Sequence, residues 1–343
     1  MSKDVRSPKT KRASLIGLKL AVSAALLAWL WSRFDIPSAL GGFLEMDIPL
    51  AGAAFAVLLL HGVLSAWRWR TIVTLQGGAL SWPEALRLFF IAMFFNQTLS
   101  TTVGGDAARV WMLHGDGMRV SQAASGVVLE RVAGLLALAP LILAGIGMLP
   151  GSIHPALYVL LVLAVGLPLA LVPATGLAAS PTKWLAAFGR FAEIGRQVLF
   201  SRVGLRVLVQ SVAIHLGVGF AVYLLARAAG VVPALWVCLA LTPPILLLAT
   251  LPISFGGWGP REAALIWLFG FFGFAAESAL AISVALGVLV MAAGLPGAVL
   301  WLKSGRTSRT RSKEPAKTAS PPLPDAAPPE AAAPPVKGSR SRE

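Results

Sequence analysis

Cysteine and acidic residues are both scarce in this sequence. The one cysteine, Cys238, excludes an intrachain disulfide and a metal cluster built on several thiolates. The four histidines show no ligand spacing, so no metal site is predicted, and no other cofactor is expected. A Walker-type phosphate loop is also absent, which argues against ATP as the direct driver of any transport.

Long polar stretches are missing from most of the chain. Charged residues make up 13% of the sequence and hydrophobic residues 57%, and the mean hydropathy is +0.77. Soluble domains carry about 25% charged residues. Several apolar runs reach the ~20 residues that cross a bilayer as a helix, and the alternation typical of barrel strands is absent. The sequence therefore predicts an all-α polytopic membrane protein.

The formal net charge of +14 has two explanations. Nucleic-acid binding is one, but no basic stripe with interleaved aromatic residues lies outside the apolar runs. Basic loops that set orientation and meet anionic lipid headgroups are the better explanation. The expected partners are thus the membrane and its anionic lipids, without nucleic acid.

Three regions are predicted along the chain. Residues 1–13 form a basic N-terminus, residues 14–303 a transmembrane domain, and residues 304–343 a basic, Pro/Ala-rich tail that is expected to be disordered. The second apolar run ends in two tryptophans and two arginines, of which Arg68 and Arg70 are predicted to be interface anchors. Six runs are interpreted as full spans: 14–31, 48–67, 122–149, 155–172, 207–226 and 279–302.

Two further apolar runs, 86–114 and 234–276, are each interrupted by a Gly-Gly pair and are predicted to be re-entrant helical hairpins. With this assignment both termini and the basic loop 174–206 face the cytoplasm, whereas the acidic loop 33–47 faces outside. The first hairpin then enters from the cytoplasm and the second from outside. Oppositely oriented broken helices of this kind surround the substrate sites of many transporters.

The two interruptions share a pattern. The first reads FNQTLSTTVGGDAAR over residues 95–109, and the second reads LPISFGGWGPRE over residues 251–262. In each, an arginine follows the first glycine by five residues. A new helix is expected after each pair, capped by Asp106 in the first and opened by Pro260 in the second. Helix N-termini and arginine side chains both favour anions, so a phosphate or carboxylate site is predicted here.

The candidate substrate-binding residues belong to these interruptions or lie near them. A structural role is the alternative for each: the arginines can pair with the acidic residues, Asn96 and Gln97 can join helices, and Glu130 can reach the membrane surface. The candidates are Arg109, Arg261, Asn96, Gln97, Gly104, Gly105, Asp106, Gly256, Gly257, Glu262 and Glu130.

The segments NQTLSTTVGGDAARVWML, LERVAGLLAL and LPISFGGWGPREAAL resemble the transmembrane domain of bacterial lysylphosphatidylglycerol synthetase/flippases and of stand-alone flippase-like proteins. The resemblance runs from about residue 14 to residue 303. It implies a polytopic inner-membrane protein that moves an anionic or aminoacylated phospholipid, or a lipid-linked glycan, between leaflets.

Bifunctional members of that family carry a large soluble domain that transfers the aminoacyl group, whereas this chain ends in a short tail. No enzymatic activity is therefore expected, and a separately encoded lipid-modifying enzyme is the partner that this arrangement suggests. Two alternatives stay open: a membrane-embedded transferase acting on a lipid-phosphate substrate, and a membrane scaffold that transports nothing.

Overall fold

A computed structural model describes residues 41–98, 104–146, 201–250 and 258–311, together with residues 182, 189, 192–193 and 196. All regular structure in these ranges is helical, as the sequence predicts. The predicted spans 14–31 and 155–172 lie outside the described residues, as do Gly256, Gly257 and the tail beyond residue 311. The helices are α3 (Ile48–Leu75), α4 (Trp82–Thr98), α5 (Gly104–Gly115), α6 (Val120–Ile146), α10 (Arg202–Ala228), α11 (Leu235–Thr250), α12 (Pro260–Gly270) and α13 (Ala276–Arg311).

Four of these helices, α3, α6, α10 and α13, are long and apolar enough to cross a membrane. The parts of these helices that could cross it are 26 to 28 residues long, or roughly 40 Å at 1.5 Å per residue, which exceeds the ~30 Å hydrocarbon core. They confirm helices at the predicted spans 48–67, 122–149, 207–226 and 279–302. The end of α13 is the largest difference, because this helix continues to Arg311.

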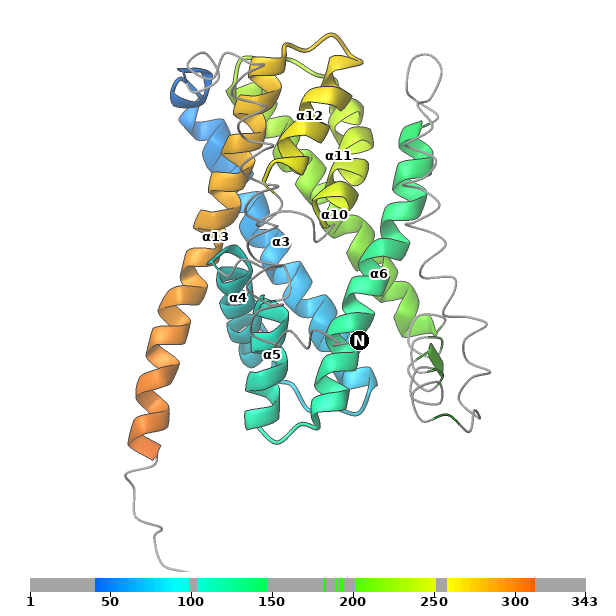
Figure 1. Cartoon of the computed structure of the whole chain (residues 1–343), viewed down its shortest axis with the longest axis vertical. Coiled ribbons are helices and arrows are strands. Elements are labelled where there is room, and N and C mark those ends of the chain that lie inside the picture. The colour runs from blue at the N-terminus through cyan, green and yellow to red at the C-terminus, as the bar shows by residue number, and fades with distance from the viewer. Residues whose placement is uncertain are drawn as a thin grey trace, which may run out of the picture. The chain divides into compact units, whose positions relative to one another are not determined.

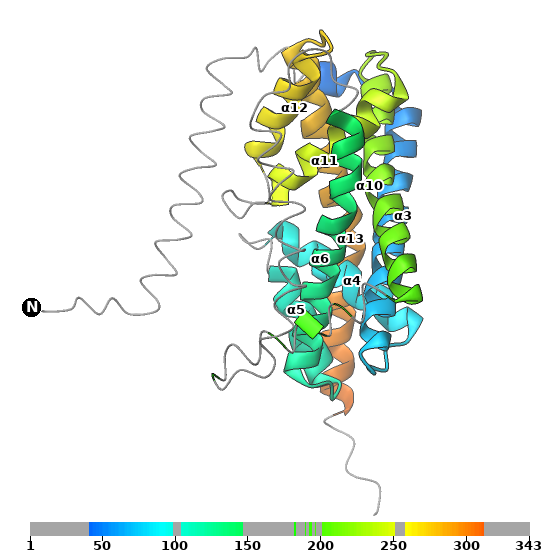
Figure 2. The same ribbon diagram turned by 90° about the vertical axis from the view of Figure 1, so that its right-hand side faces the viewer.

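The other four helices are short and form two packed pairs, α4 with α5 and α11 with α12. They contain 17, 12, 16 and 11 residues, or roughly 17 to 26 Å each, less than a full span. In both views the α4–α5 pair lies beside one half of the long helices and the α11–α12 pair beside the other half (Figures 1 and 2). Each predicted hairpin thus corresponds to a pair of short packed helices, and most of the residues that join the two helices of each pair lie outside the described part of the chain.

Local signals explain several helix ends. Asp47 caps α3 by accepting a hydrogen bond from the Leu50 amide at 2.9 Å, and the Asp47 amide donates to the Ala228 carbonyl at 2.9 Å. The second bond places the start of α3 beside the end of α10. Pro260 occupies the first position of α12, as predicted, and Gly259 precedes it with a φ of 96°, which favours glycine.

Glycines allow α4 to pack backbone to backbone against α13. A Cβ at Gly297 would overlap the carbonyl oxygen of Phe90, and one at Gly294 would lie 3.4 Å from the Cα of Phe94. As the residue number rises along α4 it falls along α13, so the two helices are antiparallel. A similar close approach joins Gly105 of α5 to α4, where a Cβ would overlap a backbone carbonyl.

Two apolar clusters hold the short pairs in place. The larger one joins residues of α3, α6, α10, α11, α12 and α13 and surrounds the second pair. The smaller one is built around Trp69 of α3 and joins it to α4, α5 and α6, so it surrounds the first pair. Each hairpin therefore has its own packed core.

Candidate functional site

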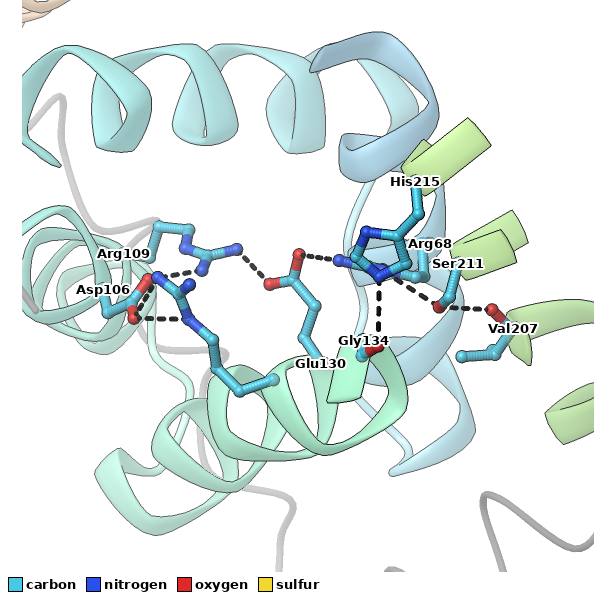
Figure 3. A network of polar contacts seen from close by, with 9 residues as sticks. Arg68, Asp106, Arg109, Glu130, Gly134, Val207, Ser211 and His215 are labelled. Carbon is cyan, nitrogen blue, oxygen red and sulfur yellow. Dashed lines mark hydrogen bonds and ion pairs between the residues drawn. The ribbon is translucent and has the colours of Figure 1, made fainter. Parts of the chain in front are cut away.

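Five charged side chains form a continuous series of ion pairs inside the helical bundle (Figure 3). In order they are Arg131, Asp106, Arg109, Glu130 and Arg68, and we call this series the charge chain. Asp106 accepts from Arg131 Nη2 at 2.9 Å and from Arg109 Nη2 at 2.6 Å. Glu130 accepts from Arg109 Nη1 at 2.6 Å and from Arg68 Nη2 at 3.0 Å. Positive and negative groups thus alternate along its length.

The charge chain joins three helices, and a hydrogen bond links it to a fourth. Arg68 comes from α3, Asp106 and Arg109 from α5, and Glu130 and Arg131 from α6. At its inner end Arg68 Nη1 donates to the hydroxyl of Ser211 on α10 at 2.9 Å. The Ser211 hydroxyl in turn donates to the Val207 carbonyl at 2.8 Å, so its own hydrogen is used and its oxygen accepts from the guanidinium.

Most of the charge chain is withdrawn from solvent. The exposed fractions of Arg68, Asp106, Arg109 and Glu130 lie between 3% and 8%, whereas the side chain of Arg131 is 46% exposed. A single charge in the middle of a membrane helix costs about 2.5–3.5 kcal/mol even on the mildest scales. Such residues therefore pair with one another, and in membrane proteins they commonly mark a pathway.

The Arg109 guanidinium also contacts two aromatic rings. It lies 4.8 Å from the ring centroid of Trp69 and 5.3 Å from that of Phe89. Trp69 is fully buried. A delocalised guanidinium over aromatic faces gains a cation–π attraction that grows when water is excluded. The rings and the two carboxylates together fix the orientation of the Arg109 fork.

The charge chain carries an excess of one positive charge, because three guanidinium groups face two carboxylates. In addition, the buried Nε atoms of Arg68 and Arg109 have no hydrogen-bond partner in the described part of the chain. Buried N–H donors without partners are costly, and an added acceptor would satisfy them. The arrangement is suited to an anion with several oxygens, such as a phosphate.

A second cluster lies at the start of α12. Arg261 Nη2 pairs with Glu262 Oε1 at 2.6 Å, and Ser283 of α13 bridges the same two side chains. The other Glu262 oxygen accepts from the Gly259 amide at 2.6 Å. The Arg261 guanidinium lies 4.7 Å from the ring centroid of Trp258. This pair is electrically neutral, unlike the charge chain.

The two clusters lie at different depths along α13. A Cβ at Gly287 would meet the Arg261 guanidinium at 2.5 Å, whereas Gly297 packs against α4 next to Phe89, the ring under Arg109. Ten residues separate these glycines, or roughly 15 Å along a helix. One phosphate group is too small to contact Arg109 and Arg261 together in this conformation.

The sequence comparison agrees with the helical arrangement. Residues 16–297 match the family model described as the lysylphosphatidylglycerol synthase TM region. The chain belongs to this family. No curated protein matches the chain. The family match and the four long apolar helices show that this lysylphosphatidylglycerol synthase TM-region protein is a multi-pass membrane protein.

Five of the predicted site residues lie in these two charged clusters, and their partners are now defined. Arg109, Asp106 and Glu130 belong to the charge chain, and Glu262 pairs with Arg261. Both arginines form the ion pairs that the structural alternative expects, and their role in substrate binding stays a prediction. Within the described residues, no group of three or more His, Cys, Asp or Glu side chains is placed to hold a metal ion.

Other predictions for the first interruption need correction. α5 begins at Gly104, so the Gly-Gly pair forms its first turn, and Asp106 is its third residue instead of its cap. Arg109 consequently lies in the second turn. The Asn96 amide oxygen accepts from the Gly105 amide at 2.9 Å, which joins the two helices of the pair. Gln97 is half-buried near the end of α4.

The prediction that Arg68 is an interface anchor is wrong. α3 continues to Leu75, so Arg68 lies inside the bundle with an exposed fraction of 8%. Arg70, by contrast, donates through Nε to the Leu80 carbonyl at 2.9 Å and is partly buried. Sequence reasoning also missed Arg131 and Ser211. The only signal in the sequence is that Glu130 and Arg131 lie within an apolar run and need partners of opposite charge.

Proposed function

We propose that this protein moves a lipid with an anionic headgroup between the leaflets of the inner membrane, without changing it covalently. The substrate class is an anionic or aminoacylated phospholipid, or a lipid-linked glycan. The observation that carries the proposal is the charge chain: a buried series of ion pairs that, counted over the described residues, has one surplus positive charge and two N–H donors without a partner. Family membership supports a role with membrane lipids.

The orientation that we propose follows from the charges at the helix ends. One end of the bundle holds the starts of α3 and α13 and the end of α10, where acidic residues prevail over Arg227. The other end holds the starts of α6 and α10 and the end of α5, where basic residues prevail. By the positive-inside rule the second end faces the cytoplasm. The acidic residues at the first end are Glu45, Asp47 and Glu277. The basic residues at the second end are Arg87, Arg119, Arg202 and Arg206, which outnumber the two acidic residues at that end, Glu84 and Asp116.

In this orientation the α4–α5 pair enters from the cytoplasm and the α11–α12 pair from outside, beside the four long helices of the described residues. Each pair carries its arginine on the helix that leads away from the interruption. This is the inverted-repeat arrangement of transporters, in which broken helices place a site inside the membrane. The two arginine clusters are then two sites at different depths along one path.

In the proposed binding step, the arginines exchange one hydrogen-bond acceptor, the Asp106 carboxylate, for another, the phosphate of the lipid. Arg131 is the part of the charge chain with the most exposed side chain, so it is the first group that an entering phosphate meets. The phosphate takes hydrogen bonds from Arg131 and Arg109 in place of Asp106, and its negative charge cancels the surplus positive charge. Because guanidinium–phosphate pairs are bidentate, the phosphate replaces the hydrogen bonds that the two arginines lose. The acyl chains stay in the lipid throughout.

The test is lipid translocation by purified protein in phosphatidylcholine vesicles that contain a fluorescent phosphatidylglycerol, with quenching of the outer leaflet as the readout. Wild type is expected to accelerate translocation over empty vesicles. Arg131→Gln removes one charged donor worth about 1.5–3 kcal/mol, so its rate should fall roughly 10- to 100-fold. Arg227→Gln is the matched control, because Arg227 is exposed and bonds Tyr223 on its own helix.

Two results would reject the proposal. Equal rates for the Arg131 and Arg227 variants would remove the charge chain from the path. No acceleration by wild type with anionic, aminoacylated or glycan-linked lipids would favour a scaffold. A changed lipid mass after incubation with a lipid-phosphate donor would instead indicate a transferase.

A further inference from the structure

The inner end of the charge chain borders a histidine that the proposed function does not use. His215 lies one turn after Ser211 on α10, and its Nε2 is 3.0 Å from the Gly134 carbonyl (Figure 3). A Cβ built at Gly134 would lie 4.0 Å from His215 Nε2 and 3.8 Å from Arg68 Nη1. The His215 imidazole and the Arg68 guanidinium therefore both lie next to Gly134.

A second histidine belongs to the same group. His61 lies seven residues before Arg68 on α3, which places both side chains on one face of the helix. His61 interacts electrostatically with Arg68 and Glu130, and His215 interacts with Arg68 and His61. Both histidines are half-buried in the bundle.

The charge chain, whose inner end borders these histidines, draws its charged groups from three helices. α3 contributes Arg68, α5 contributes Asp106 and Arg109, and α6 contributes Glu130 and Arg131. α11, which packs against α10, contains no charged residue. Of these groups, Arg68 acts on both histidines and Glu130 acts on His61, so a cation on His215 would be repelled by Arg68.

The hydrogen bond to Gly134 defines where a proton can be added. Because a carbonyl oxygen only accepts, Nε2 of His215 carries a hydrogen in the neutral ring, which leaves Nδ1 as the basic atom. Protonation at Nδ1 keeps the bond to Gly134 and makes a cation next to Arg68. An anion bound to the charge chain cancels the surplus charge and so removes the repulsion.

We infer that His215, together with His61, takes up a proton when an anionic headgroup occupies the charge chain, so that lipid and proton move together. The inference rests on the proposed function and supplies its coupling ion. Linkage makes the effect reciprocal: if the anion promotes protonation, a lower pH tightens binding of the anion by the same factor. Histidine is the side chain that titrates in the physiological range, whereas a phosphodiester stays ionised throughout it.

The test measures binding of phosphatidylglycerol to the full-length protein in neutral detergent at about pH 5.5 and about pH 7.5. We expect wild type to bind roughly fivefold or more tightly at the lower pH, within the usual range of coupling between sites. In a weakly buffered solution, a pH-sensitive dye should report uptake of up to about one proton per bound lipid. Inorganic phosphate in place of the lipid distinguishes a headgroup site from a general anion site.

The variants are His215→Gln and His61→Gln, with His114→Gln as the control. Glutamine can still donate to the Gly134 carbonyl but cannot be protonated. His114 is exposed at the end of α5, near the Met118 carbonyl, so its replacement should keep the wild-type pH dependence. Both inner variants should bind at pH 7.5 as wild type does, while losing the gain at the lower pH and the proton uptake.

The outcomes separate the two proposals. If phosphatidylglycerol binds and moves but the inner variants keep the full pH dependence, the histidine site is wrong and carboxylate titration explains the effect. If wild type binds no anionic lipid at either pH, the proposed function itself fails. Should His215→Gln not fold, His61→Gln decides, because His61 makes no hydrogen bond within the described residues that the change would break. Unchanged pH dependence in that variant overturns the inference.

Discussion

Glu130 is the residue on which the charge chain depends most, because its two oxygens accept from two different arginines. Oε2 accepts from Arg109 at 2.6 Å and Oε1 from Arg68 at 3.0 Å. In the Glu130→Gln variant the amide oxygen can accept from only one of them, and the amide nitrogen faces the other guanidinium as a second donor. The variant also raises the surplus positive charge from one to two.

The expected loss of stability is large. Removing one partner of a buried ion pair costs about 3–5 kcal/mol, since a buried charge is left uncompensated. At about 2–4 °C per kcal/mol for a chain of this size, the melting temperature in mild detergent should fall by roughly 6–20 °C. Glu193→Gln is the matched control. It breaks an exposed pair with Arg196 at 2.7 Å, and such pairs contribute little.

A double-mutant cycle then tests the connection to Arg68. In Arg68→Gln/Glu130→Gln the second change removes a carboxylate that the first has already deprived of one of its two arginine partners. The loss should therefore be smaller than the sum of the single losses by about 0.5–3 kcal/mol, the range for residues in contact. Two results would refute the reasoning: a Glu130→Gln variant as stable as the Glu193 control, or strictly additive losses in the cycle.

Two further predictions concern topology and packing. The topology can be tested in a Cys238→Ser background, which is free of cysteine. A cysteine introduced at exposed Asp116 should react with a membrane-impermeant thiol reagent from the cytoplasmic side, and one introduced at exposed Val232 should react from outside. Labelling of both positions from one side would exclude the inverted arrangement of the hairpins. Gly297→Ala should lower stability by about 1–3 kcal/mol, because its methyl group would overlap a backbone carbonyl of α4. Gly52→Ala, where nothing lies within 4 Å, should be neutral or stabilising by up to about 1 kcal/mol. Equal effects of these two changes on the melting temperature would contradict the packing of α4 on α13.

Local features predicted much of the fold. The hydrophobic runs at 48–67, 122–149, 207–226 and 279–302 correspond to α3, α6, α10 and α13, because the length of an apolar helix must match the membrane. The interruptions at residues 99–103 and 251–257 separate short helices, and Pro260 starts α12 as its fixed φ favours. Helix ends were predicted less well, since α3 continues past Trp67 to Leu75.

The sequence alone determined the class of protein, the long helices and the places where charge enters apolar runs, since hydrophobicity, helix breakers and charge are local properties. Only the tertiary structure decided which charges meet. Arg68, Arg109 and Glu130 lie on three helices and far apart in the chain, and their pairing depends on how α3, α5 and α6 pack. Likewise, Arg109 and Arg261 have equivalent places in two similar motifs. The packing of α4 against α13 nevertheless puts the two arginines at different depths. The contact between these helices depends on glycines of α13, which are not part of either motif.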